Sequence, residues 1–187
     1  MSVLVTAFGP FGDRTENISS IVLRNLREEL PEIRTRIFPV DSVIAPSGLK
    51  QAIRRIQPSA IVMLGESAAC DCIQLESTAW NEKSFGIPDI RGRQPFGEPI
   101  RSQSPSSLFS TLPLQNIRQK LASHGHLSAI SHDPGRYLCN QIFFTALDFL
   151  GSENSHIPAG FIHLPLENRV PADQTTKAIH AVLETLH

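Results

Sequence analysis

Short apolar runs alternate with helical apolar patterns along this chain, and no other feature of the sequence constrains the fold as strongly. Residues 3–8 and 60–64 are mainly apolar and are followed by Gly9 and Gly65, as is typical of buried strands. Between such runs, apolar residues recur every three or four positions, as they do on the buried face of a helix. Strands that alternate with helices favour a largely parallel sheet covered on both faces. The sequence therefore predicts an α/β protein, a three-layer α/β/α sandwich around a largely parallel, mixed sheet.

The expected elements follow one another along the whole chain. Strands are expected at 3–8, 33–40, 60–64, 127–131 and 157–163, with a further extended segment at 73–80. Helices are expected at 18–30, 46–57, 114–121, 138–150 and 172–186. Residues 86–113 are rich in Pro, Gly and Ser, which indicates a long surface excursion that borders the site. A chain of 187 residues can bury one substantial core, so residues 1–187 are predicted to form a single domain.

Composition argues against several classes of partner. The formal net charge is -1, and no basic run is longer than the pair Arg54-Arg55, so neither a nucleic acid nor an anionic membrane surface is an expected partner. The first residues lack the basic flank and cleavage site of a secretory signal, and no apolar stretch has transmembrane length. Three cysteines without disulfide-framework spacing suit a reducing cytoplasm. Cys70 and Cys72 lack a second close pair of ligands, so no metal and no other cofactor is predicted.

Cys139 and His163 each stand where a turn signal meets an apolar segment. A thiol just before the helical run 141–150 would feel the positive end of that helix, which favours thiolate over thiol, and a nearby imidazole would complete a nucleophilic pair. Each residue could also have a purely structural role. A lone cysteine is more often a small buried hydrophobe, and a histidine that ends a strand is usually a hydrogen-bonded polar residue.

The expected topology makes a shared site possible. Ligands of parallel α/β folds bind beyond the carboxyl ends of the strands. The loops after 3–8, 60–64, 127–131 and 157–163 should meet there and bring together Phe8, Phe11, Glu66, Cys139 and His163. Glu76 could accept the second imidazole N–H and stabilise an imidazolium, although an exposed salt bridge is the more ordinary role of a lone carboxylate. Phe8 and Phe11 could equally be core residues.

Six short motifs tie these residues together. They are V-L-V-T-A-F-G-P-F-G at 3–12 with Asn17 and Ser19; Glu76, Ala79 and Asn81; I-P-D at 87–89 with Gly92, Q-P at 94–95 and E-P-I at 98–100; S-T-L-P at 110–113; Gly135 with Cys139-Asn140; and G-F-I-H-L-P at 160–165. Their order and spacing resemble those of the pyroglutamyl peptidase I (pyrrolidone-carboxylate peptidase) family of cysteine peptidases. The resemblance covers essentially the whole chain.

The resemblance implies an enzyme that hydrolyses the amide bond after an amino-terminal pyroglutamate of a peptide. Cys139 would be the nucleophile, His163 the base and then the acid, and Glu76 the orienting carboxylate, with a thioester intermediate. The neutral lactam ring would need an apolar slot with a few backbone partners. The residues implied for that slot are Phe8, Phe11, Asn17, Glu66 through its carbonyl, Tyr137 and Leu138. Relatives are commonly homotetramers, so a homo-oligomer is expected.

The chain also departs from the family pattern. Gly65-Glu66-Ser67-Ala68-Ala69-Cys70 stands where the family has G-Q-A-G-G-R, and Gly86 replaces an arginine thought to stabilise the oxyanion or the thiolate. Arg136 or Lys83 could restore the charge. We expect a working peptidase, slow or altered in preference; the alternative is a non-enzymatic homologue that binds pyroglutamyl peptides or a small lactam as a sensor. An anion-binding loop at 8–12 is disfavoured, because it lacks the P-loop lysine and G-x-G-x-x-G spacing.

Overall fold

The computed structural model describes residues 2–12 and 14–186. Its elements in chain order are β1 (Val3–Phe8), α1 (Ile18–Glu29), β2 (Arg34–Phe38), α2 (Ile44–Ile56), β3 (Ala60–Ser67), β4 (Ile73–Glu76), β5 (Thr78–Trp80), β6 (Ser107–Phe109), α3 (Leu114–Ser123), β7 (Ser128–Ser131), α4 (Leu138–Ser152), β8 (Ala159–Pro165) and α5 (Ala172–Glu184). The strands and helices expected from the apolar patterns all occur, with ends that differ by a few residues.

The main sheet has six strands in the order β2-β1-β3-β8-β4-β7. Neighbours among β2, β1, β3 and β8 are parallel, whereas β4 is antiparallel to β8 and β7 is parallel to β4. A separate pair, β5 and β6, is antiparallel. Four strands of the main sheet therefore run one way and two run the other.

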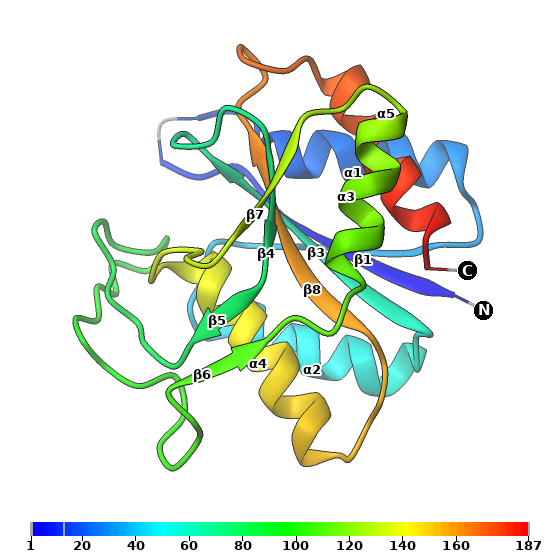
Figure 1. Cartoon of the computed structure of the whole chain (residues 1–187). Coiled ribbons are helices and arrows are strands. Elements are labelled where there is room, and N and C mark those ends of the chain that lie inside the picture. Colours follow the sequence, from blue (N-terminus) through cyan, green and yellow to red (C-terminus); the bar gives the residue numbers. More distant parts are fainter. Residues whose placement is uncertain (1, 13, 187) are drawn as a thin grey trace.

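Helices cover both faces of the main sheet (Figure 1). Helices α1, α3 and α5 pack on one face against side chains such as Val62 and Leu64 of β3. Helices α2 and α4 pack on the other face against alternate residues such as Ile61 and Met63. This alternation is what a strand buried on both sides requires, since successive side chains point to opposite faces. The predicted fold class, a mainly parallel mixed sheet between two helical layers, is confirmed.

Local chemistry explains where the helices begin and which face they bury. Helix α1 starts after Asn17, whose side-chain oxygen accepts the N–H of Ser19 at 3.0 Å, as expected of an N-cap residue. Its residues Ile18, Val22 and Leu26 recur every four positions and are buried against the sheet. Helix α4 is apolar on most sides, because the sheet, α2 and β5 all pack against it.

Strand direction is the main difference from the expected topology. The sequence placed the loop after 127–131 with the carboxyl ends of the parallel strands, but β7 runs against β8. The chain therefore crosses from β7 to the start of α4 through residues 132–137, and Cys139 reaches the site from the helix that precedes β8. Apolar runs reveal that a strand is buried but carry no information about its direction, which explains this error.

Two further differences concern the segments that border the site. The extended segment 73–80 breaks at Ser77, so that β4 belongs to the main sheet and β5 to the small one. The surface excursion contains β6, and an isolated bridge joins Lys83 to Glu98. In Figure 1 the chain between β5 and β6 extends outward at the left, away from both termini.

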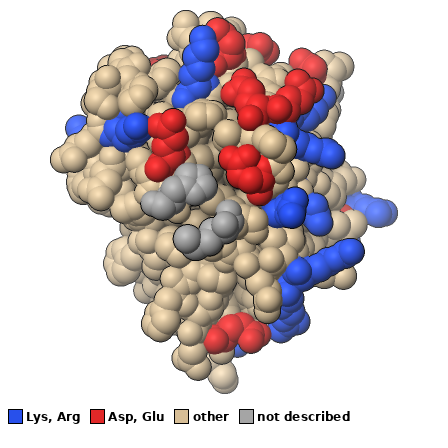
Figure 2. Space-filling model, turned by 90° about the vertical axis from the view of Figure 1, so that its right-hand side faces the viewer, with Lys and Arg blue, Asp and Glu red and all other residues tan. Residues whose placement is uncertain are grey.

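The surface opposite this excursion is mixed in charge. Figure 2 shows that acidic side chains gather toward the top of this face and basic ones along its right-hand side, among many uncharged residues. This face is therefore not uniformly basic. Among residues 2–12 and 14–186, no helix is long and apolar enough to span a bilayer.

Candidate active site

Cys139 lies in the first turn of α4, next to the backbone of β3 at Gly65. Helix α4 begins at Leu138, and the first intrahelical bond of its ladder runs from Gln141 N–H to Tyr137 C=O at 3.0 Å. The N–H groups before Gln141 precede this ladder, so Cys139 sits at the positive end of the helix. A Cβ placed on Gly65 would lie 2.8 Å from the Cys139 Sγ, which leaves the sulfur in direct contact with the β3 backbone.

His163 and Glu76 come from adjacent antiparallel strands. His163 lies near the carboxyl end of β8 and Glu76 ends β4, and His163 Nδ1 is 2.7 Å from Glu76 Oε1. Both side chains are buried. Because Nδ1 faces the carboxylate, Nε2 is the nitrogen left to interact with Cys139. The other carboxylate oxygen of Glu76 is buried without a hydrogen-bond partner among the described residues, so His163 is the main compensation for its charge.

The neighbours of His163 favour its charged form. Burial alone would lower the pKa of His163, but the charge of Cys139, the hydrogen bond to Cys139 and the contact with Glu76 raise it to about 10. An imidazolium between a sulfur and a carboxylate is therefore the stable state near neutral pH. The three residues that the sequence singled out for chemistry, Cys139, His163 and Glu76, are brought together.

A pocket of about 480 Å³ opens beside Cys139. Cys139 and all six residues expected for the ring slot line it, namely Phe8, Phe11, Asn17, Glu66, Tyr137 and Leu138. His163 and Glu76 lie behind the sulfur, outside this lining. The pocket is largely apolar, because its lining includes Phe8, Phe11 and Tyr137; the ring centroids of Phe11 and Tyr137 lie 5.6 Å apart.

Some of these lining residues also stabilise the surrounding fold. Asn17 caps α1, as described above. The Glu66 carboxylate accepts Arg14 Nη1 at 2.9 Å and the N–H of Ile18 at 3.2 Å, which ties the first loop to the end of β3. The Glu66 backbone carbonyl, which is expected to accept the N–H of the bound ring, is separate from the side-chain carboxylate that binds Arg14 and Ile18. The Tyr137 hydroxyl donates to Pro88 C=O at 3.2 Å, and burial raises the pKa of Tyr137.

The sequence reasoning missed five residues of the lining. These are Gly12, Arg14, Val40, Ala68 and Ile87. Ile87 belongs to the I-P-D motif and Gly12 to the first motif, so for these two a signal was present but was not connected with the pocket. Val40 and Arg14 carry no motif signal, because only the packing of their loops brings them to the pocket.

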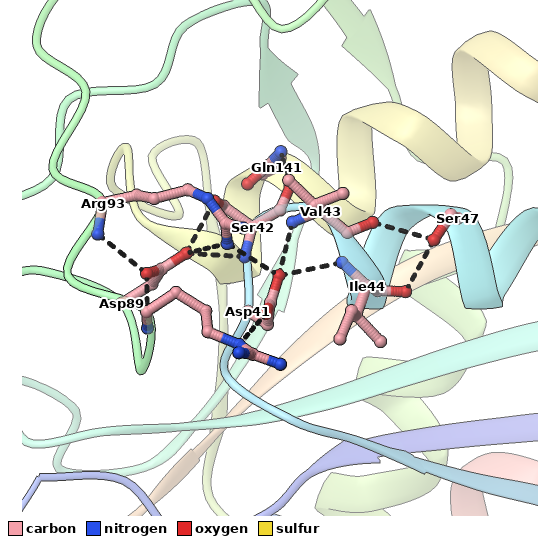
Figure 3. Close-up of polar contacts among 9 residues, drawn as sticks. Asp41, Ser42, Val43, Ile44, Ser47, Asp89, Arg93 and Gln141 are labelled. Carbon is pink, nitrogen blue, oxygen red and sulfur yellow. Dashed lines mark hydrogen bonds and ion pairs between the residues drawn. The ribbon is translucent and has the colours of Figure 1, made fainter.

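A buried polar cluster holds the wall that contains Ile87 (Figure 3). The Asp89 carboxylate accepts Ser42 N–H at 2.9 Å and Ser42 Oγ at 2.7 Å, and it also accepts the N–H groups of Arg91 and Arg93, both at 2.9 Å. Burial would raise the pKa of Asp89, but these hydrogen bonds hold it far below its usual value. Gln141 Nε2 donates to Ser42 C=O at 2.9 Å, which joins the cluster to α4.

The structure also locates the charges considered as substitutes for the family arginine. Arg136 is 3.3 Å from Glu82 and 2.5 Å from Asp133, and its guanidinium lies 4.9 Å from the Trp80 ring centroid. Lys83 pairs with Glu98 at 3.1 Å. Neither side chain lines the pocket, whereas Arg14 does. A replacement of the missing charge by Arg136 or Lys83 is therefore not supported.

No group of three or more His, Cys, Asp or Glu side chains within the described part of the chain is arranged to hold a metal ion. What the residues do provide is a thiol at a helix start, an imidazole, a buried carboxylate and an apolar pocket. This combination suits nucleophilic attack on a carbonyl of a small ligand.

Comparisons with known proteins agree with this chemistry. The family model "Pyroglutamyl peptidase" matches residues 1–185. Pyrrolidone-carboxylate peptidase 1 of Caldanaerobacter subterraneus is 31% identical over 88% of this chain and 82% of its own length. The Bacillus subtilis pyrrolidone-carboxylate peptidase is 31% identical over 95% of this chain and 84% of its own.

Solved structures extend the similarity to the fold. The pyroglutamyl peptidase I of Bacillus amyloliquefaciens has a TM-score of 0.93 and 29% identity, and it covers 99% of this chain and 94% of its own. The pyrrolidone carboxyl peptidase of Thermococcus litoralis has a TM-score of 0.91 and 29% identity, with 98% and 91% covered. The chain therefore belongs to the pyroglutamyl peptidase family, and its activity is that of a pyroglutamyl peptidase.

Proposed function

We propose that Cys139, His163 and Glu76 form a catalytic triad that cleaves amino-terminally pyroglutamylated peptides through a thioester. The observation that carries this proposal is the 2.7 Å contact between His163 Nδ1 and Glu76 Oε1 behind a helix-start cysteine that lines an apolar pocket. The Cys139 thiolate attacks the pyroglutamyl carbonyl carbon. The imidazolium of His163 then gives its proton to the departing amine as the C–N bond breaks.

Hydrolysis of the thioester completes the cycle. His163, now neutral, takes a proton from water, whose oxygen attacks the thioester carbonyl and releases pyroglutamate. The thiolate is regenerated and the imidazole holds the proton again. Glu76 does not exchange protons in this scheme; it fixes the ring orientation and stabilises the imidazolium. The N–H of Cys139 at the helix start, which has no hydrogen-bond partner among the described residues, is a suitable donor to the oxyanion.

The pocket supports pyroglutamate as the residue bound beside Cys139. The ring is a neutral lactam without an ammonium group, so it suits a pocket walled by Phe8, Phe11 and Tyr137. The Glu66 carbonyl is the expected acceptor of the ring N–H. An unblocked amino terminus would place a charge among aromatic rings at a desolvation cost, which disfavours ordinary peptides.

A chromogenic pyroglutamyl amide tests the assignment. The wild-type protein should release the chromophore, and Cys139→Ala should lose at least about a thousandfold in kcat/KM, since it removes the nucleophile. A glutaminyl amide of the same chromophore is the substrate control, and Cys72→Ala, which removes a thiol outside the pocket, is the matched variant. Equal rates for wild type and Cys139→Ala would refute the assignment.

The pH profile gives an independent check. Protonation of the leaving amine requires imidazolium, and the pKa of His163 is raised to about 10, so activity should fall as the pH passes through about 10. Glu76→Gln removes a group that raises this pKa and should move the alkaline limb to lower pH. The cytoplasmic location and the homo-oligomeric state expected from the sequence stay predictions.

A further inference from the structure

The first turn of α4 contains a buried amide that the proposed mechanism does not use. Asn140 follows the nucleophile directly and has no exposed surface. Its side chain points away from the pocket, toward β5, the strand that continues from Glu76 through Ser77. A buried polar side chain is retained only with its hydrogen bonds satisfied, so its partners indicate its role.

All three hydrogen bonds of this amide go to the backbone around β5. Asn140 Oδ1 accepts Trp80 N–H at 2.7 Å, and Nδ2 donates to Trp80 C=O at 2.8 Å and to Glu82 C=O at 2.9 Å. Asparagine offers two N–H donors, and both are used. The Asn140 amide accepts the N–H of Trp80 and donates to the C=O of the same residue. Two facing residues of an antiparallel ladder are paired by the same two hydrogen bonds. Asn140 therefore acts as one residue of an additional strand along β5.

The bonds join α4, which carries Cys139, to β5, which follows Glu76 at the end of β4 after the single residue Ser77. Glu76 is held by pairing of β4 with both β8 and β7, so its backbone is fixed by the main sheet. Cys139 is not part of the sheet, because α4 reaches the site through the irregular loop 132–137. That loop is held by bonds from Ser84 N–H to Arg136 C=O at 3.0 Å, from Trp80 Nε1 to His132 C=O at 3.2 Å and from Tyr137 Oη to Pro88 C=O at 3.2 Å, and Gln141 holds the first turn of α4 through Ser42.

We propose that Asn140 is a positioning residue that holds the Cys139 sulfur against His163 by pairing the start of α4 with β5. This inference rests on the proposed role of Cys139 as nucleophile. Loss of the three bonds leaves α4 free to shift at its first turn, and a displacement of about 1 Å can reduce a rate about a hundredfold. The sulfur would also lose contact with the imidazolium that favours its thiolate form.

Asn81, which directly follows β5, provides a matched control. Its amide also makes three backbone bonds, to Arg101 C=O at 2.8 Å, to Ser104 C=O at 3.2 Å and from Arg101 N–H at 2.9 Å. These bonds organise the surface excursion and do not reach α4. Asn81→Ala therefore removes the same number of hydrogen bonds without releasing the nucleophile.

The test is the rate of iodoacetamide alkylation at Cys139 across a range of pH, followed by mass spectrometry of the peptide that contains it. Each variant is first checked for folding by thermal melting. Asn140→Ala should lower the alkylation rate at pH 7 at least about threefold and at pH 10 by less, because a displaced sulfur loses the imidazolium that favours its thiolate form. Asn140→Ser, which keeps one donor, should give a smaller loss and decides the question if the alanine variant does not fold. Asn81→Ala should match the wild type.

Hydrolysis of a pyroglutamyl amide adds a second readout. In Asn140→Ala, kcat should fall at least about tenfold, and the loss should exceed that of Asn81→Ala. The proposal is overturned if Asn140→Ala is alkylated at the wild-type rate at pH 7, or if Asn81→Ala lowers that rate equally. Because alkylation needs no pyroglutamyl substrate, a failure of the proposed peptidase mechanism would be recognised separately, by unchanged turnover in Cys139→Ala.

Discussion

The pocket beside Cys139 and the proposed catalytic triad next to it differ in the kind of side chain that builds them. The pocket wall consists mainly of apolar side chains from loops and from the ends of strands and helices. The polar cluster of Asp41, Ser42, Asp89, Arg93 and Gln141 holds the part of this wall that contains Ile87. The catalytic group consists of buried polar side chains that satisfy one another directly, as His163 and Glu76 do at 2.7 Å. Apolar walls tolerate change gradually, whereas a buried charge without its partner is costly. Substitutions should therefore have graded effects in the first region and severe effects in the second.

The largest effect of a substitution in the proposed triad should come from His163→Ala. This change removes the proposed proton donor and also leaves the Glu76 carboxylate buried without compensation, which should lower the free energy of unfolding by about 3–5 kcal/mol. Urea denaturation at pH 7 measures this loss. Cys139→Ala should alter stability by no more than about 1 kcal/mol.

The double variant His163→Ala with Glu76→Gln sharpens this comparison, since it removes the uncompensated charge and should recover part of the stability. The raised pKa of His163 determines the pH range over which His163 stabilises the fold. This stabilisation is complete below about pH 6.5, the pKa of histidine in the unfolded chain, and is lost as the pH rises through about 10, the pKa of His163 in the folded protein. A constant difference between wild type and His163→Ala from pH 6 to 11 would contradict this account.

Gly65→Ala tests the contact between the sulfur and β3. The new Cβ would lie 2.7 Å from the Phe161 ring and 2.8 Å from the Cys139 Sγ, so the sulfur must move. We expect kcat/KM to fall about a hundredfold and the unfolding free energy to fall by about 1–3 kcal/mol. Steady-state kinetics and urea denaturation check both values. Gly151→Ala, where nothing lies within 4 Å, should leave activity intact.

Asp89→Asn should affect binding more than turnover. The amide cannot accept all the donors that converge on the carboxylate, so the wall that carries Ile87 should loosen while the triad stays in place. KM should rise about tenfold, which corresponds to about 1.4 kcal/mol, with kcat little changed. Asp148→Asn, which alters a carboxylate paired with Arg101 far from the pocket, is the control. An equal loss in kcat would show that wall and triad are not independent.

Gly86→Arg should have the smallest effect. Gly86 is exposed and a Cβ there meets no atom within 4 Å, so the arginine fits without strain. An exposed charge near the site is worth up to about 1 kcal/mol, so kcat/KM should rise by no more than about fivefold. This gain should shrink in high salt, and Gly86→Gln should not reproduce it. A loss of activity would indicate that Gly86 is required in this chain.

Much of the fold followed from apolar patterns, and the site followed mainly from motifs. The runs at 60–64 and 157–163 identified the central strands β3 and β8, because such strands are buried on both faces. The reversed direction of β4 and β7 could not be predicted, since the residue pattern of a strand carries no information about its direction. Cys139 and His163 stood out beside turn signals, whereas the Glu66 side-chain clamp and the role of Ser42 depend on loops that meet only after folding.

Trp80 in β5 is the single tryptophan of the chain, so its fluorescence reports on this strand. Its indole lies against the Arg136 guanidinium and donates to His132 C=O at 3.2 Å, while its backbone is paired with Asn140. The tryptophan fluorescence of the unlabelled protein thus originates from a residue that is hydrogen-bonded to Asn140, the neighbour of Cys139. Stopped-flow tryptophan emission would follow the proposed formation of the thioester and its hydrolysis in real time, without a dye or a chromogenic leaving group.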